Sequence, residues 1–86
     1  MKSDIEALKL LDLKVGDVLS IMELDDRAEK LFKEDDMESY LSQFHYDEVI
    51  EWEEYHLYKE KSQEFPYIVY FELIEYREDY SLIRII

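Results

Sequence analysis

Apolar and polar positions alternate with a period of about two over residues 48–60, a pattern typical of β-strands. In this stretch Trp52, His56 and Tyr58 share a side, while Glu51 and Glu53 fall on the other. The next stretch is the most apolar of the chain and is expected to form a strand covered on both faces. The expected meander comprises strands at 48–60, 65–74 and 81–86, joined by turns at 61–64 and 77–80.

A short helix is predicted over residues 3–11. Ser3 or Asp4 is a suitable N-cap, and Glu6 follows Ser3 by three positions, as in a capping box. Ile5 would then begin the side of the helix that packs on the rest of the protein.

A strand and a longer helical stretch are expected to follow. Residues 18–24 predict a strand, although their alternation is imperfect. Behind it, Asp-x-x-Glu capping patterns begin at Asp26 and again at Asp35, and each precedes apolar residues at helical spacing. Residues 26–44 are therefore expected to form one bent helix or two short helices.

Together these elements predict an α+β fold in a single domain, residues 1–86: an N-terminal helix, a strand, one or two further helices, then an antiparallel meander that forms one sheet. Hydrophobic residues make up 48% of the chain, which is too many for a disordered acidic tail. There is no cysteine, and small secreted domains usually need disulfides, so a cytoplasmic location is expected. No apolar run approaches the roughly 18 residues of a membrane span.

Negative charge is concentrated in the middle of the chain. The formal net charge is −13, and residues 34–58 contain nine acidic residues and no Lys or Arg. Such a field repels nucleic acid and attracts proteins that bind nucleic acid. The simplest interpretation is a solvated face. The alternative is mimicry, because same-face strand residues repeat at about 6.6–6.8 Å, near twice the axial rise of about 3.4 Å per phosphate on one DNA strand.

No residue pattern predicts an enzyme, a metal site or a cofactor. Glu53-x-x-His56 matches half of a carboxylate-bridged metal motif but has no second copy. The two Asp-Asp pairs lack the spacing and the mid-loop glycine of a calcium loop. There is no glycine-rich phosphate cradle, and the carboxylates are too numerous to indicate a general acid or base.

Eight tyrosines are many for a core of this size. Their rings can pack beside the sheet with the hydroxyls in water, or they can form an interface, since tyrosine is enriched at binding hot spots. Self-association of a structural or assembly domain through a Tyr-rich sheet therefore stands as an alternative from another functional class.

Chain length, acidity, element order and three short segments resemble the phage uracil-DNA glycosylase inhibitor family. Residues 3–5 resemble the opening of that family's first helix. Residues 20–29 resemble its passage from the first strand into the second helix, and residues 66–69 (Pro-Tyr-Ile-Val) resemble its late strand. The chain departs from the family's pattern at three positions, where the family has an acid, a proline and an acid: Leu19, Asp25 and Arg27.

The resemblance implies a protein that occupies the DNA groove of the glycosylase and does not bind nucleic acid itself. Ser20 would sit near the groove floor, with Asp26 and Glu29 against phosphate-binding groups. Taken with the acidic stretch, the candidate partner-binding residues are Ser20, Asp25, Asp26, Glu29, Asp35, Asp36, Glu38, Glu51 and Glu53. An apolar pocket between the second helix and the sheet would take a loop residue of the enzyme, and its candidate lining residues, which also fit plain core packing, are Met22, Ala28, Leu31 and Phe32.

The leading hypothesis is a small, acidic, non-enzymatic DNA mimic in the cytoplasm of a host cell, with uracil-DNA glycosylase as its first expected partner. Alternatives of the same kind are another phage or plasmid counter-defence protein, such as an anti-CRISPR, or an immunity protein for a nuclease toxin. Neither a membrane nor a cofactor is expected to be involved, and a homo-oligomer is compatible with the sequence.

Overall fold

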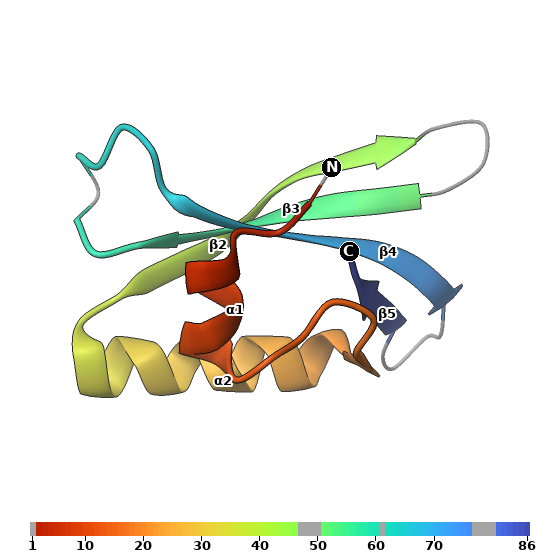
Figure 1. The fold of residues 1–86 in the computed structure, drawn as a ribbon, viewed down its shortest axis with the longest axis horizontal. Coiled ribbons are helices and arrows are strands. Elements are labelled where there is room, and N and C mark those ends of the chain that lie inside the picture. The colour runs from red at the N-terminus through yellow and green to blue at the C-terminus, as the bar shows by residue number, and fades with distance from the viewer. Residues whose placement is uncertain (1, 47–50, 61, 77–80) are drawn as a thin grey trace.

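Five strands form one antiparallel sheet, and two helices pack on one of its faces (Figure 1). The structure is a computed structural model that describes residues 2–46, 51–60, 62–76 and 81–86. Its elements are α1 (Ile5–Leu11), β1 (Val18–Ser20), α2 (Ile21–Asp35), β2 (Glu38–Tyr46), β3 (Glu51–Tyr58), β4 (Tyr67–Tyr76) and β5 (Ser81–Ile85). The strand order across the sheet is β1-β5-β4-β3-β2. The predicted α+β class, with a helix and a strand first and a meander last, is confirmed.

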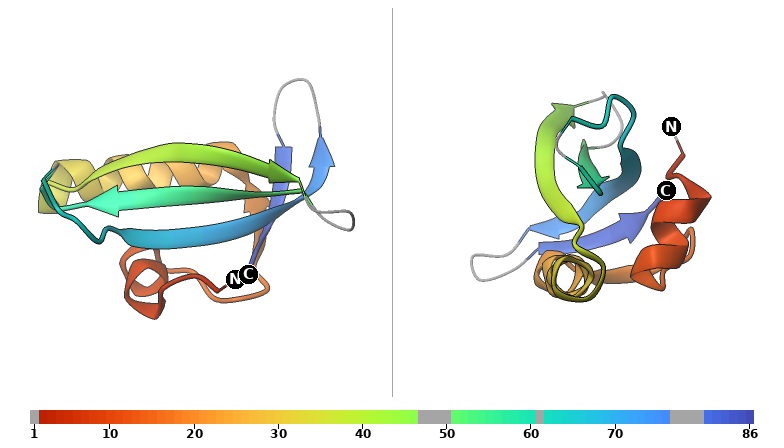
Figure 2. Two further views of the ribbon diagram at one scale, coloured as in Figure 1. Left: turned by 90° about the horizontal axis from the view of Figure 1, so that it is seen from above. Right: turned by 90° about the vertical axis from the view of Figure 1, so that its left-hand side faces the viewer.

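The predicted strand boundaries in the meander lie within two residues of those in the structure where it describes them. Residues 48–50 and the predicted turn at 77–80 lie outside the described residues, as does Lys61 of the other predicted turn. In Figure 2, β5 crosses the direction of β2 and β3 at a steep angle, so the sheet is strongly twisted. This twist curves the sheet around the helices, and side chains from the sheet and from both helices form one core.

The core lies between the sheet and both helices. It comprises Ala7, Leu8, Leu11, Leu13, Leu19, Leu24, Ala28, Leu31, Met37, Tyr55, Leu57, Val69, Phe71, Ile83 and Ile85. The alternation predicted for β3 is confirmed, because Tyr55 and Leu57 are buried while His56 between them is only partly buried. The expectation that β4 is covered on both faces is wrong: Val69 and Phe71 are fully buried, but Tyr70 on the opposite face is only partly buried.

The segment before α1 is held by the edge of β4 and does not form the predicted capping box. The Ser3 hydroxyl accepts a hydrogen bond from the Tyr70 N–H at 2.7 Å and donates one to the Tyr70 carbonyl at 3.0 Å. Asp4 accepts from the Ile68 N–H at 2.8 Å, and no side chain caps α1. Because β5 ends at Ile85, residues 3–4 take its place beside the first half of β4. This also explains why Ile5, expected on the packed side of the helix, is 69% exposed.

Substituting Ser3 by alanine is expected to lower the free energy of unfolding by about 1–3 kcal/mol, because it leaves the Tyr70 N–H without this partner in a poorly hydrated place. Ser3 itself is buried. Urea denaturation followed by circular dichroism measures the change. The matched control is Ser62→Ala in the exposed connection between β3 and β4, where we expect almost no effect. Equal stability of the two variants would show that this contact does not tether the N-terminus.

The second helix begins at Ile21, five residues before the predicted start. The N-cap is Ser20, whose hydroxyl accepts a hydrogen bond from the Glu23 N–H at 3.1 Å. The predicted strand over 18–24 is therefore only three residues long, and the expected cap at Asp26 lies inside the helix.

The second helix also ends nine residues before the predicted end. Asp36 adopts the left-handed conformation (φ 54°), and its N–H bonds to the Leu31 carbonyl, which stops the helix. The expected cap at Asp35 is therefore the last helical residue. The chain then forms β2, where a second helix or helical extension was predicted, because β3 supplies an antiparallel partner along its whole length.

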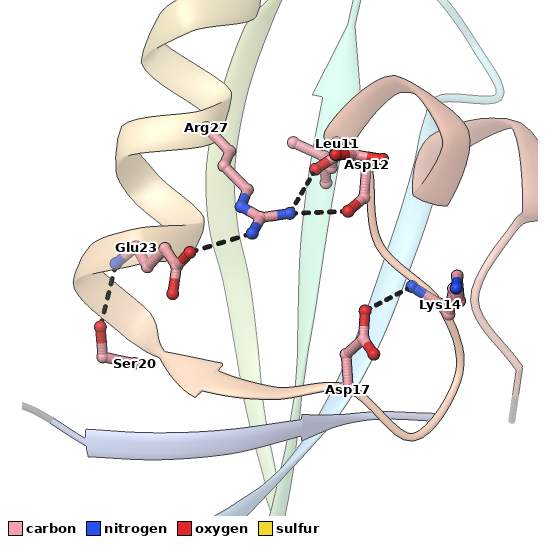
Figure 3. Close-up of polar contacts among 7 residues, drawn as sticks. All are labelled: Leu11, Asp12, Lys14, Asp17, Ser20, Glu23 and Arg27. Carbon is pink, nitrogen blue, oxygen red and sulfur yellow. Dashed lines mark hydrogen bonds and ion pairs between the residues drawn. The ribbon is translucent and has the colours of Figure 1, made fainter.

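Arg27 fastens α2 to the end of α1 (Figure 3). Its guanidinium donates to the carbonyls of Leu11 at 2.9 Å and Asp12 at 2.7 Å, and it bonds the Glu23 carboxylate at 2.9 Å. The carbonyls at the C-terminus of a helix have no partners within the helix, so the cation satisfies them and also complements the negative end of the helix dipole. This contact fixes the two helices relative to each other on the sheet.

Candidate functional site

A groove runs between α2 and β2 and is bordered by acidic side chains. Its lining residues are Asp25, Ala28, Glu29, Phe32, Glu38, Ser39 and Tyr55. Asp25 and Glu29 lie one helical turn apart and therefore project from the same side of α2. They face Glu38, which begins β2. Three of the predicted partner-binding carboxylates thus lie around one groove, although the predicted helices and strands did not place them near one another.

A second hollow continues this groove at the N-terminal end of α2. It is lined by Ile21, Glu51, Glu53, Leu73, Tyr76 and Ser81. Ile21 precedes Asp25 by one turn, about 6 Å along the helix, and Glu53 precedes Tyr55 by one same-face step, about 6.6–6.8 Å along the strand. The two hollows therefore lie next to each other along α2 and β3; the first also reaches β2, and the second reaches β4 and β5. We call the carboxylates that border them, Asp25, Glu29, Glu38, Glu51 and Glu53, the acidic seam.

Tyr55 connects the two walls of the groove. Its ring is 4% exposed, and its hydroxyl donates to the Asp25 carboxylate at 3.1 Å. The same hydroxyl lies 3.0 Å from the Ser39 hydroxyl on β2. Burial raises the pKa of the Tyr55 phenol to about 12, so it remains a proton donor at neutral pH. The Asp25 carboxylate is thereby oriented before any partner arrives.

Glu53 is a partly buried member of the acidic seam. Burial beside apolar side chains of the second hollow raises the pKa of its carboxyl above the ordinary value of 4.5. The native protein therefore holds this proton at a pH where the unfolded chain has lost it. It follows that Glu53 contributes stability below pH 4.5, and that this contribution is lost as the pH rises through the folded-state pKa.

The variant Glu53→Gln is expected to be more stable than the parent protein at pH 7 and equally stable at pH 3.5, because its amide stays neutral throughout. The measurement is the difference in unfolding free energy between the two proteins from pH 3.5 to pH 7. All other groups titrate alike in both proteins and cancel in this difference. Glu64→Gln, at an exposed position, is the control and should show no such trend. A Glu53→Gln difference that does not change with pH would contradict the assigned burial.

Two basic residues of α2 lie away from the acidic seam. Asp25 and Glu29 belong to the seam, whereas Arg27 and Lys30 line a different groove between α1 and α2, together with Glu34 and Asp35. Lys33 pairs with Glu29 at 3.1 Å, but both side chains are more than half exposed, so this contact restrains the glutamate little. The seam consequently presents mostly carboxylates to solvent.

Four of the predicted partner-binding residues lie outside the seam. Ser20 is the N-cap of α2, Asp26 is exposed and lines neither hollow of the seam, and Asp36 ends the helix. Asp35 borders the groove between α1 and α2. The prediction placed the last two at the start of a helix, and their actual place at a helix end turns them away from the seam.

The predicted apolar pocket residues are also divided. Ala28 and Phe32 line the groove, and Phe32 is 52% exposed. Leu31 is buried in the core and borders the groove toward α1, whereas Met22 is 58% exposed. Only part of the predicted pocket exists, and its walls are acidic as well as apolar.

Sequence reasoning missed two residues that organise the seam, Ser39 and Tyr55. No local signal identifies them, because their hydroxyls meet only when β2 pairs with β3 and α2 lies across both. Within the part of the chain that the structure describes, no group of three or more His, Asp or Glu side chains is placed to hold a metal ion. No described helix is long and apolar enough to cross a membrane.

The chain matches no known protein-family model, and comparison with curated proteins and with solved structures found no similar protein.

Proposed function

We propose that this protein is a non-enzymatic inhibitor that presents the acidic seam to the DNA-binding groove of a nucleic-acid enzyme, with uracil-DNA glycosylase as the first partner. The observation that carries this proposal is that the five carboxylates of the acidic seam, from α2, β2 and β3, border two neighbouring hollows. A solvated acidic face requires only exposed charges in any arrangement, whereas a mimic requires them in a row.

The spacing of the seam supports this function. Glu51 and Glu53 repeat at about 6.6–6.8 Å along β3, and Asp25 and Glu29 repeat at about 6 Å along α2. Both distances are near twice the axial rise per phosphate on one DNA strand, about 3.4 Å. A groove whose cations are placed for phosphates would therefore find carboxylates at every second phosphate position.

The rigidity of the seam supports it as well. Its charges stand on two strands and a helix, and Tyr55 fixes the Asp25 carboxylate. The side chains of the seam then lose little conformational freedom on binding, which is the advantage of a preorganised ligand over flexible DNA. The order helix, strand, helix, meander is the one that the resemblance to uracil-DNA glycosylase inhibitors implies. The proposed site of action is the cytoplasm of the host cell.

The first test is glycosylase activity on uracil-containing DNA with an equimolar amount of this protein added. We expect activity to be lost as the molar ratio to enzyme approaches one when DNA is limiting, and to return when DNA is added in large excess, because this protein and DNA compete for one groove. Undiminished activity would exclude this glycosylase as the partner. Nucleases and CRISPR effector enzymes, assayed in the same way, would then separate the immunity-protein and anti-CRISPR alternatives.

A further inference from the structure

The outer edge of β2 is the longest free strand edge of the sheet. The strand order ends in β1 on one side and β2 on the other, and these strands are three and nine residues long. In the part of the chain that the structure describes, β2 pairs with β3 alone among the strands. Every second residue of an edge strand directs its backbone N–H and C=O groups outward, where they can pair with another strand.

This edge has only one of the features that usually prevent pairing. Proteins protect free edges with charged side chains, proline, very short strands or bulges, and β2 after its first residue has a bulge alone. Residues 39–46 (Ser-Tyr-Leu-Ser-Gln-Phe-His-Tyr) contain neither proline nor any Asp, Glu, Lys or Arg, and they form the longest run without such a charge in a chain that is 38% charged. The longest uncharged segment of the chain therefore lies on the longer of the two outer strands of the sheet.

We infer that β2 pairs in antiparallel fashion with β2 of a second copy of this chain, which joins the two sheets into one. A symmetric dimer brings identical surfaces together. Two chains with a net charge of −13 repel each other almost everywhere, so the uncharged edge is the place where a symmetric contact costs least. This contact uses the strand edge and does not depend on the inhibitory function proposed above.

A bulge fixes the position of the two-fold axis. The register of β2 against β3 shifts between Leu41 and Gln43, so Ser42 is the extra residue at the centre of the strand. With the axis beside Ser42, the half of β2 before the bulge pairs with the partner's half after it. Each uninterrupted ladder of backbone hydrogen bonds is then four residues long, and Ser42 lies opposite Ser42 of the second copy.

Salt concentration distinguishes this dimer from binding to a cationic enzyme. The Debye length falls from about 10 Å at 0.1 M salt to about 3 Å at 1 M, which removes the repulsion between the two copies. We expect the dimer dissociation constant, measured by sedimentation equilibrium, to decrease by more than about tenfold between 0.05 M and 1 M NaCl. A protein that stays monomeric at millimolar concentration in 1 M NaCl would overturn the inference.

Single cysteines test the geometry, since the chain has none of its own. Residues directly opposite in antiparallel strands have Cα atoms about 4.5–5.5 Å apart, a separation that suits a disulfide. In 1 M NaCl, Ser42→Cys is expected to form a disulfide-linked dimer under mild oxidation. Ser62→Cys, an exposed serine away from β2, is the matched control and should stay largely monomeric.

A third variant tests whether the edge itself makes the contact. Leu41 is 45% exposed, so Leu41→Lys is tolerated by the fold, which circular dichroism verifies. It places two like charges beside the axis and, at 0.1 M NaCl, where they are only partly screened, should weaken the dimer by at least about tenfold. An unchanged dimer in Leu41→Lys, or crosslinking of Ser62→Cys as efficient as that of Ser42→Cys, would show that the copies associate elsewhere.

Discussion

Replacing Glu29 and Glu51 together by lysine is expected to weaken binding to uracil-DNA glycosylase by about a hundredfold or more. The two glutamates come from different elements and border different hollows of the acidic seam. In the proposed complex each faces a cation of the phosphate-binding groove. Each reversal turns an attraction into a repulsion, and close interfacial charge pairs contribute about 1.5 kcal/mol or more each. Titration of the enzyme with the variant, by calorimetry or by inhibition, gives the loss.

The control for this experiment changes the same total charge at another place. Glu60 and Glu64 lie exposed in the connection between β3 and β4, outside the acidic seam. Replacing both by lysine alters the long-range field by the same amount but leaves the seam intact, so we expect less than about a tenfold loss. If both double variants bind equally well, net charge alone attracts the partner, and the arrangement of the seam carries no specificity.

Substituting Phe71 by alanine is expected to lower the free energy of unfolding by about 3–5 kcal/mol. Phe71 lies at the centre of β4, is fully buried and belongs to the core beneath both helices. Its removal loses the transfer free energy of the ring and leaves a cavity that the neighbouring strands cannot fill. In a chain of this length that is much of the total stability, so the variant should be partly unfolded at 37 °C.

The same substitution at Phe65 provides the matched comparison. Its ring is 80% exposed, just before β4, and its loss should change the unfolding free energy by less than about 0.5 kcal/mol. Urea denaturation of both variants and of the parent protein measures the contrast. If Phe71→Ala is no more destabilised than Phe65→Ala, the core is not the one described.

The meander was predictable from the sequence because alternation with a period of two is a local signal. The start of α2 was also present in the sequence but was overlooked. Ser20 and Glu23 form the same cap pattern as the one expected at Asp26, and Ile21 and Leu24 begin an apolar stripe at helical spacing. Reading residues 18–24 as a strand concealed the cap that ends β1 and starts α2.

The prediction of a helix where β2 forms was wrong for a different reason, which is the bulge at the centre of this strand. Because the register shifts there, Leu41 and residue 44 lie opposite Tyr55 and Glu53, two positions on one face of β3. Their separation of three residues imitates the spacing of a helix, although it belongs to a bulged strand. A single sequence gives no sign of a bulge, which depends on the partner strand.

The acidic seam was only partly predictable. Charge density identified Glu38, Glu51 and Glu53. Glu29 became a candidate through the resemblance, and both Glu29 and Asp25 lie before the acidic stretch. What joins the two groups is the packing of α2 against β2 and β3, a long-range arrangement without a local signature. The same packing leaves Asp35 and Asp36 outside the acidic seam, although the sequence alone made them equally suitable for binding a partner.

The most direct test of the proposal that the acidic seam replaces a DNA backbone is the affinity of this protein for uracil-DNA glycosylase at 0.05 M and 0.3 M NaCl, measured at constant pH. Ion pairs between a carboxylate row and a phosphate groove are screened by salt, so the dissociation constant should rise by more than about tenfold over this range. An affinity that is the same at both salt concentrations, or no binding at either, would contradict it.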